Sequence, residues 1–150
     1  MPVILKRALI VFLFLLMLTF FIVPERLFEF PSSSPILWLL VMFLYPVLSA
    51  YPQELLYRTF IFERYKKAIT SPFRLGLFST FSFMFLHIIY GNFLAPVLPL
   101  GGGILFTNTY KKTNSLMAVA IELAIYGCIV FTIGLGRFFY EMAHSNTLPK

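Results

Sequence analysis

The stretch YPQELLYRTF, residues 51–60, carries a glutamate and an arginine inside a chain that is otherwise almost entirely apolar. The two residues, Glu54 and Arg58, are four positions apart and would be neighbours on one face of a helix. Ionisable side chains in a membrane-spanning segment are energetically expensive, and where they occur they usually face the protein interior and have a function. This pair is therefore the first candidate for a functional site.

The composition identifies the class of protein. The 150 residues are 59% hydrophobic and only 12% charged, whereas a soluble domain is about 25% charged. The net charge of +6 could suggest nucleic acid, but the basic residues lie in short clusters between apolar runs and form no continuous basic face. We therefore predict an integral membrane protein that lies in the lipid bilayer and binds no nucleic acid. Its single cysteine, Cys128, excludes an intramolecular disulfide.

Five apolar runs predict the helices, and they cover residues 8–23, 36 to the 51–60 stretch, 75–90, 93–109 and 116–135. Several are shorter than the roughly 20 residues that span a bilayer, so we count their flanks as helix. The fold class is therefore predicted to be all-α, a polytopic transmembrane helix bundle of about five helices. The sequence PSSSP (31–35) is predicted to be a polar turn outside the membrane.

The first run is also compatible with a cleaved signal peptide, because basic residues precede its apolar core. No small-x-small cleavage site follows it. We predict a retained N-terminal helix or signal anchor over residues 1–30, a core over residues 36–136 and a short tail over residues 137–150.

The basic residues predict the orientation in the membrane. Alternating the segments puts eight of them on one side, Lys6, Arg7, Arg64, Lys66, Lys67, Arg74, Lys111 and Lys112, and three on the other, Arg26, Arg137 and Lys150. Because loops rich in Lys and Arg stay in the cytoplasm, we predict a cytoplasmic N-terminus and an external C-terminus.

Glu54, His87 and Glu122 are predicted to lie at a similar depth on three different helices. They are ten, thirteen and ten residues from the nearest basic loop, or roughly 15–20 Å at about 1.5 Å per residue. Phe83, one helical turn before His87, and Tyr57 could support a site there. An ion pair that only holds helices together, with a hydrogen-bonded structural histidine, would explain the same residues without a site.

Residues that break or bend helices accompany the polar ones. Pro46 and Pro52 are predicted to interrupt the second helix, and three glycines, 101–103, lie in the fourth run. Bends and small residues are compatible with a cavity, and equally with a tightly packed bundle.

Two stretches resemble motifs of the CPBP family of intramembrane proteases. QELLYR (53–58) is similar to the family's Glu-Glu-x-x-x-Arg motif, and FMFLH (83–87) is similar to its Phe-x-x-x-His motif. The family includes CAAX-processing endoproteases and bacterial proteins linked to bacteriocin maturation and immunity. The resemblance implies a protease core over residues 36–136 of a protein that we expect in the bacterial inner membrane.

The resemblance also implies roles for residues. In the family the first glutamate activates water, while the second glutamate and the arginine organise the site. Glu54, Arg58, Phe83 and His87 match the motifs, but Gln53 occupies the place of the water-activating glutamate. An amide cannot take a proton from water near neutral pH.

The family's third motif, a histidine followed four residues later by Asn or Asp, is also altered. The corresponding positions hold Leu123 and Gly127, and neither can bind a metal. Glu54 could itself be the base, and Glu122 could turn into the site. Glu54, His87 and Glu122 would then offer two carboxylates and an imidazole, a ligand set that a divalent metal such as zinc accepts.

Three functions remain open from the sequence. The resemblance implies an intramembrane endopeptidase, a hydrolase acting on a membrane-associated peptide or protein. Gln53 and Leu123 favour a catalytically silent relative that binds a peptide, a lipid or a partner protein. A small transporter using Glu54 and His87 as a proton relay would need further polar residues along a path, and the sequence supplies few. The substrate and the oligomeric state are not determined by the sequence.

Overall fold

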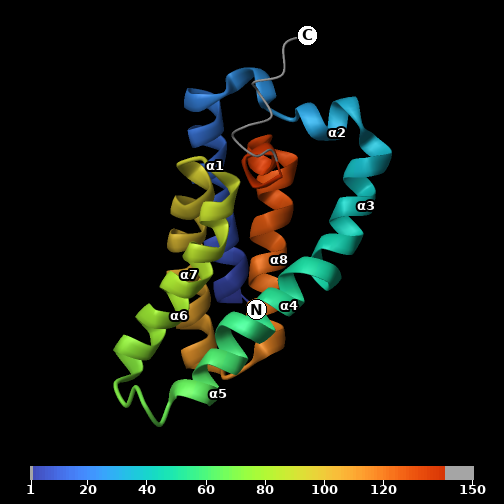
Figure 1. Ribbon diagram of the computed structural model, residues 1–150. Coiled ribbons are helices and arrows are strands. Elements are labelled where there is room, and N and C mark those ends of the chain that lie inside the picture. Colours follow the sequence, from blue (N-terminus) through green and yellow to red (C-terminus); the bar gives the residue numbers. More distant parts are fainter. Residues whose placement is uncertain (1, 141–150) are drawn as a thin grey trace. The chain divides into compact units, whose positions relative to one another are not determined.

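The computed structural model describes residues 2–140, which form helices and turns without a β-strand (Figure 1). The predicted all-α helical bundle is confirmed. The predicted tail, 137–150, is described as far as residue 140, and the remainder lies outside the described residues. The chain divides into two compact units, the first formed by Met1–Glu54 and Ser115–Gly136 and the second by Leu55–Asn114 and Arg137–Lys150.

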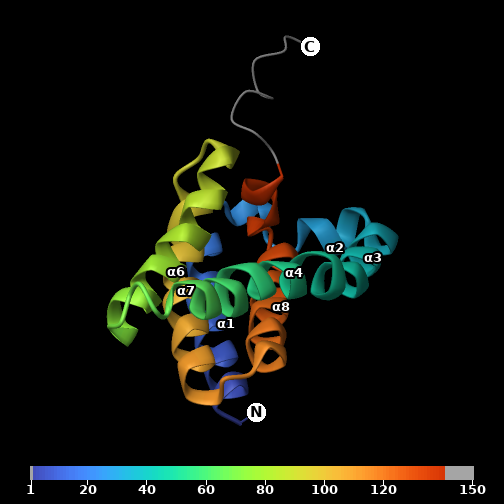
Figure 2. The same cartoon turned by 60° about the horizontal axis from the view of Figure 1, so that its bottom comes forward.

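The first unit contains two long helices and several short helical segments. Its elements are α1 (Pro2–Ile22), a 3₁₀ turn (Pro24–Arg26), α2 (Glu29–Ser33), α3 (Pro35–Tyr45), a π-helical turn (Pro46–Ala50), α4 (Tyr51–Glu54) and α8 (Leu116–Thr132). Helices α1 and α8 lie side by side in both views (Figures 1 and 2).

Apart from Lys6 and Arg7 near its start, helix α1 is apolar on all sides, as expected of a helix that crosses a membrane. It buries one narrow stripe, Ile4, Ala8, Leu15 and Thr19. Large side chains on its other faces, such as Phe21, are exposed. A helix with this distribution is suited to contact lipid on most of its surface.

The predicted polar turn at residues 31–35 is only partly correct. Residues up to Ser33 belong to α2, and the break is confined to Ser34, whose φ and ψ are −142° and 63°. Proline disfavours the helical conformation in the residue before it, while its own fixed φ suits the first turn of a helix. Pro35 therefore accounts both for the break at Ser34, after α2, and for the start of α3.

The predicted interruption is partly correct at Pro46, where α3 gives way to a π-helical turn, and wrong at Pro52, which lies inside α4. The chain stays helical from Pro35 to Tyr65. A proline inside an α-helix removes one backbone hydrogen bond and clashes with the preceding turn. Here residues 46–50 adopt a wider π-helical turn, and a second π-helical stretch follows at Leu55–Phe60. The chain accommodates the prolines by widening the helix.

Contacts between α3 and α8 hold the first unit together. The Trp38 indole donates a hydrogen bond to the Thr132 hydroxyl at 3.0 Å, and the Tyr45 ring packs edge-on against Phe131 at 5.4 Å between centroids. Just after α8, Gly134 has a φ of +99°, and a side chain there would collide with the carbonyl of Arg26. Glycine is required at this position for both reasons.

The second unit is built on an antiparallel pair of helices. Its elements are the π-helical Leu55–Phe60, α5 (Ile61–Tyr65), α6 (Pro72–Leu86), a 3₁₀ turn (His87–Tyr90), α7 (Leu94–Thr113) and most of a second 3₁₀ turn (Leu135–Phe139). Helix α6 begins at Pro72, and the Ser71 hydroxyl accepts a hydrogen bond from the Arg74 amide. Helix α7 ends at Thr113, and the residue that follows, Asn114, has a left-handed φ of 48°.

Small residues let α6 and α7 approach closely. A Cβ added at Gly76 would lie 2.9 Å from Cγ2 of Thr107, and one added at Gly103 would lie 3.1 Å from Cγ2 of Thr80. The hydroxyl of Thr80 lies 3.2 Å from the Gly103 carbonyl and 3.1 Å from the Thr107 hydroxyl. The interface combines small residues with hydrogen bonds between helices, as is common within membranes.

Within residues 2–140, three helical stretches are long and apolar enough to cross a membrane, namely Pro2–Ile22, Pro35–Tyr65 and Pro72–Tyr90. Leu116–Thr132 is a shorter apolar helix. The fourth predicted run forms α7, whose 20 residues include Pro99 and end in two lysines. Each of the five predicted apolar runs therefore lies on a helix.

Candidate functional site

Four of the predicted site residues meet in the second unit around Phe83. This ring is buried on α6, with only 1% of its surface exposed. The Tyr57 ring packs edge-on against it at 5.5 Å between centroids, the His87 ring lies at 4.9 Å, and the Arg58 guanidinium carbon lies 5.0 Å from the ring centroid. Phe83 thus holds an arginine, a histidine and a tyrosine together.

Arg58 is fully buried and is held from several sides within the second unit. Its Nη1 donates to the Ser79 hydroxyl at 3.2 Å, and Nη2 donates to the Gly103 carbonyl at 3.4 Å. The guanidinium also lies over the Phe106 ring at 5.8 Å. Because the planar guanidinium both donates in two directions and stacks on rings, lysine would be a poor substitute. The arrangement fixes a positive charge against α6 and α7.

His87 stands at the junction where α6 tightens into a 3₁₀ turn, and its ring orientation is fixed. Nδ1 lies 2.9 Å from the Phe83 carbonyl. A carbonyl can only accept, so Nδ1 carries the proton and Nε2 is the acceptor atom of the neutral ring. A histidine that binds a metal or exchanges a proton through Nε2 commonly has its other nitrogen bonded in this way.

Two further rings of the second unit flank His87. Phe139 and Tyr90 lie 5.8 and 6.0 Å from the imidazole, centroid to centroid. The segment carrying Phe139 is anchored by Asn92, whose side-chain amide donates to the Phe138 carbonyl at 2.7 Å. No pattern in the sequence predicts this contact between a helix end and a segment 46 residues later.

Gln53 and Glu54 belong to α4 in the first unit. The carboxylate-bearing side chain of Glu54 is fully buried. The amide nitrogen of Gln53 donates to the hydroxyl of Ser49, one turn earlier, at 2.6 Å. Gln53 therefore uses one of its two donors on its own helix.

Glu122 is fully buried on α8 in the first unit and is held by two donors. Arg7 Nη1 lies 3.2 Å from Oε1, and the Tyr126 hydroxyl donates to the same oxygen at 2.9 Å. Leu123, the next residue, is buried too. Arg7 was predicted only as a topology signal, and nothing in the sequence pairs residues 115 positions apart.

Gly127, four residues after Leu123, is covered by an aromatic ring. A Cβ at this position would collide with the phenol end of Tyr45, including its hydroxyl oxygen. The space that a side chain at residue 127 would need is therefore filled by Tyr45.

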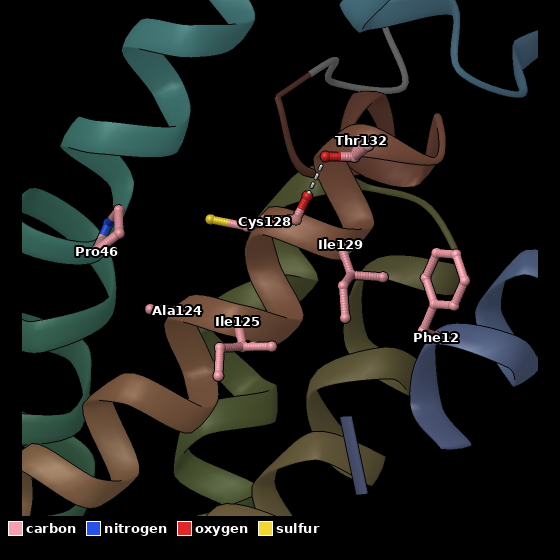
Figure 3. Close-up of a pocket in the computed structure, with 7 residues that line it drawn as sticks. All are labelled: Phe12, Pro46, Ala124, Ile125, Cys128, Ile129 and Thr132. Carbon is pink, nitrogen blue, oxygen red and sulfur yellow. Dashed lines mark hydrogen bonds between the residues drawn. The ribbon is translucent and has the colours of Figure 1, made fainter. Parts of the chain in front are cut away.

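The first unit also contains an open groove of about 400 Å³ beside α8 (Figure 3). It is lined by Phe12, Pro46, Ala124, Ile125, Cys128, Ile129 and Thr132. In Figure 3 Pro46 and Phe12 lie on opposite sides of the α8 residues. The Thr132 hydroxyl donates to the Cys128 carbonyl at 2.7 Å. The groove is apolar, and the predicted site residues do not line it.

The sequence matches one protein family, described as type II CAAX prenyl endopeptidase Rce1-like, over residues 33–136. The chain belongs to this family. The predicted resemblance to the CPBP family proteases is thereby confirmed. No curated protein and no solved structure matches the chain.

Membership of this family supports a general function of the intramembrane endopeptidase type. Together with the three described stretches that are long and apolar enough to cross a membrane, it identifies an integral membrane protein whose surroundings are the lipid bilayer. Helix α1, which supplies Arg7 to Glu122, lies outside the matched residues.

Proposed function

We propose that this protein is an intramembrane endopeptidase that hydrolyses a peptide bond in a membrane-associated peptide or protein. The proposal is supported by the family and by one feature of the second unit, the contact of Tyr57, Arg58 and His87 with the same buried ring, Phe83. Groups packed in this way are held in place before a substrate binds, which is what electrostatic catalysis requires.

Each residue has a defined chemical role in this proposal. Glu54 takes a proton from water as the water adds to the peptide carbonyl, and it returns the proton to the leaving amine. Gln53 cannot do this, because an amide is not a base near neutral pH. The protonated form of His87 donates from Nε2 to the oxyanion, and Arg58 supplies a fixed positive charge.

A zinc ion on His87, Glu54 and Glu122 is a further part of the proposal. Zinc would supply a bound water of lowered pKa. His87 has the setting of a ligating histidine, since Nδ1 is bonded to a carbonyl. Oε1 of Glu122, in contrast, already accepts from Arg7 and Tyr126. The steps above therefore use only the side chains.

The metal has its own test. Elemental analysis of the purified protein should find about one zinc per chain, lost on His87→Ala and on Glu122→Gln. Glu122→Gln keeps the shape of the side chain but removes the charge that pairs with Arg7, so the thermal unfolding of this variant is measured together with its zinc content. Metal-free protein of full activity would remove zinc from the proposal and leave the carboxylate chemistry in place.

The activity is tested with the full chain reconstituted in lipid vesicles and a fluorogenic prenylated peptide ending in a CAAX sequence. Glu54→Gln and His87→Ala should each lower the rate by about a hundredfold or more. Arg26→Gln is the matched control, because Arg26 is exposed and pairs with Glu29 at 2.8 Å. Cleavage that survives Glu54→Gln unchanged would sink the assignment of the base.

The second candidate is a catalytically silent family member that binds a peptide, lipid or partner. It is favoured by the hydrogen bond from Gln53 to Ser49 and by the ion pair that occupies Glu122. The double variant Gln53→Glu with Leu123→His separates the two functions. If this variant cleaves the peptide and the native chain does not, the native protein is silent.

A further inference from the structure

Six exposed basic residues lie near one end of the second unit. They are Arg64, Lys66 and Lys67 at the end of α5, Arg74 at the start of α6, and Lys111 and Lys112 at the end of α7. The antiparallel packing of α6 and α7 places the start of one helix beside the end of the other (Figures 1 and 2). We refer to these six residues as the basic end.

Ring contacts bring the three helices of the basic end together. Phe62 of α5 packs edge-on against Tyr110 of α7 at 5.1 Å between centroids. Tyr65 of α5 packs in the same way against Phe78 of α6 at 5.2 Å. Phe62 and Tyr65 flank Arg64 closely in the sequence, and Tyr110 directly precedes Lys111. The packing of these aromatic rings therefore brings together cations from three different helices.

The lysine at the end of α7 also reaches α6. A Cβ placed on Gly76 would lie 3.9 Å from Cδ of Lys111. The aliphatic part of the Lys111 side chain therefore lies against α6 at Gly76, which is two residues after Arg74 in the sequence. Long basic side chains often bury their stems in this way while the charged group stays in water.

Acidic residues neutralise little of the positive charge of the basic end. Between residues 55 and 114 the sequence has one acidic residue, Glu63, and it forms an ion pair with Lys66. Exposed aromatic residues lie beside the cations, with Phe73 68% and Tyr65 38% exposed. Tyrosine is enriched where a helix leaves the hydrocarbon, and aromatic residues beside cations are the composition expected at the level of the lipid headgroups.

We infer that the basic end binds the phosphate groups of anionic phospholipids. Clusters of four to eight Lys and Arg beside a membrane-spanning helix attract acidic lipids, with about 1 kcal/mol per cation, or roughly fivefold in affinity. The orientation of the protein in the membrane depends only on the difference in Lys and Arg content between its loops, and it does not require the basic residues to lie close together. The convergence of three helix ends provides a surface on which several headgroups can be bound at once.

The test uses the purified full chain in neutral detergent. Dihexanoyl phosphatidylglycerol and dihexanoyl phosphatidylcholine are titrated separately, and bound lipid is counted by native mass spectrometry. The acidic lipid should bind more tightly, and added salt should weaken it, because exposed charges are screened. Lys111→Gln with Lys112→Gln should weaken its binding by roughly 25-fold. Arg64→Gln with Lys67→Gln should do the same.

The control pair is Lys6→Gln with Arg26→Gln, which removes two cations from the first unit and should leave the affinity unchanged. Inorganic phosphate at the same concentration should not displace the lipid, because it lacks the acyl chains that hold a headgroup at this level. Equal binding of the two lipids would overturn the inference. So would unchanged binding in both basic-end variants, or inorganic phosphate that binds as tightly as the lipid.

Discussion

At the scale of single residues, the contact between Glu122 and Arg7 has a large expected effect on stability. The Glu122 side chain is fully buried, and that of Arg7 is 18% exposed. A buried charge that loses its partner remains desolvated, so removing one member of such a pair destabilises a protein much more than removing both. Glu122 is therefore an important structural residue of the first unit whatever its role in chemistry.

Arg7→Met should lower the free energy of unfolding by about 2–4 kcal/mol, since it leaves Glu122 with Tyr126 as its remaining described donor. The double variant Arg7→Met with Glu122→Leu should recover most of this loss, because an apolar pair fits the same setting. Thermal unfolding in detergent measures both. A double variant less stable than Arg7→Met would contradict the expected coupling.

Arg58 is fully buried, and a hydroxyl, a carbonyl and two aromatic rings of the second unit contact it. The hydrogen bonds to Ser79 and Gly103 could not be predicted from the sequence, because nothing marks Ser79 and because glycines 101–103 indicate only that helices can approach closely there. The motif FMFLH did single out Phe83 and His87, and the structure places both rings next to each other. A spacing of four residues is enough to predict contact within one helix, but not across helices.

At the scale of elements, close approach between α6 and α7 depends on Gly76. Gly76→Ala should destabilise the second unit by about 1–3 kcal/mol, because the new methyl group would overlap Cγ2 of Thr107. Thr107→Ser in the same chain removes that methyl and should restore most of the stability. The comparison of the single and double variants by thermal unfolding tests the contact. Gly101→Ala is the control, since a Cβ there meets no described atom within 4 Å.

The packing of α3 against α8 also limits which side chains fit at Gly127, the last position of the altered third motif. Gly127→Asn, which restores a side chain of the family pattern, should be poorly tolerated because the Tyr45 ring fills the space. Tyr45→Ala combined with Gly127→Asn should be more stable than Gly127→Asn alone. If the single variant Gly127→Asn has the same unfolding temperature as the native protein, the Tyr45 ring moves away without cost and the expectation is wrong. Any attempt to restore the motif should therefore change Tyr45 as well.

At the scale of the whole molecule, the distribution of Lys and Arg predicts how the chain crosses the membrane. After Cys128→Ala, a single cysteine at Ser33 or at Thr113 reports the side on which each loop lies. A membrane-impermeant maleimide should label Ser33→Cys on intact cells and Thr113→Cys only after permeabilisation, since the lysines before Thr113 favour the cytoplasm. The opposite pattern of labelling would reverse the predicted orientation.

The fold class and the membrane environment could be predicted from composition, because a chain so poor in charge cannot be a soluble domain. The family could be predicted from two short motifs in the right order. The role of Arg7 could not, since its partner Glu122 lies on a different helix and in a distant part of the sequence. The helical residues 29–33 were missed because serine and proline are typical of turns.

The two π-helical stretches, Pro46–Ala50 and Leu55–Phe60, affect how this chain can be aligned with its relatives. Each i→i+5 bond encloses one residue more than the i→i+4 bond of an α-helix, so a π-helical turn accommodates an extra residue without breaking the helix. A relative that lacks one residue here could form a plain α-helix and still present the same side chains beyond it. Alignments of this chain with its relatives should therefore allow a one-residue gap next to QELLYR. Without such a gap, residues of the motif would be aligned with the wrong residues of a relative that lacks the extra position.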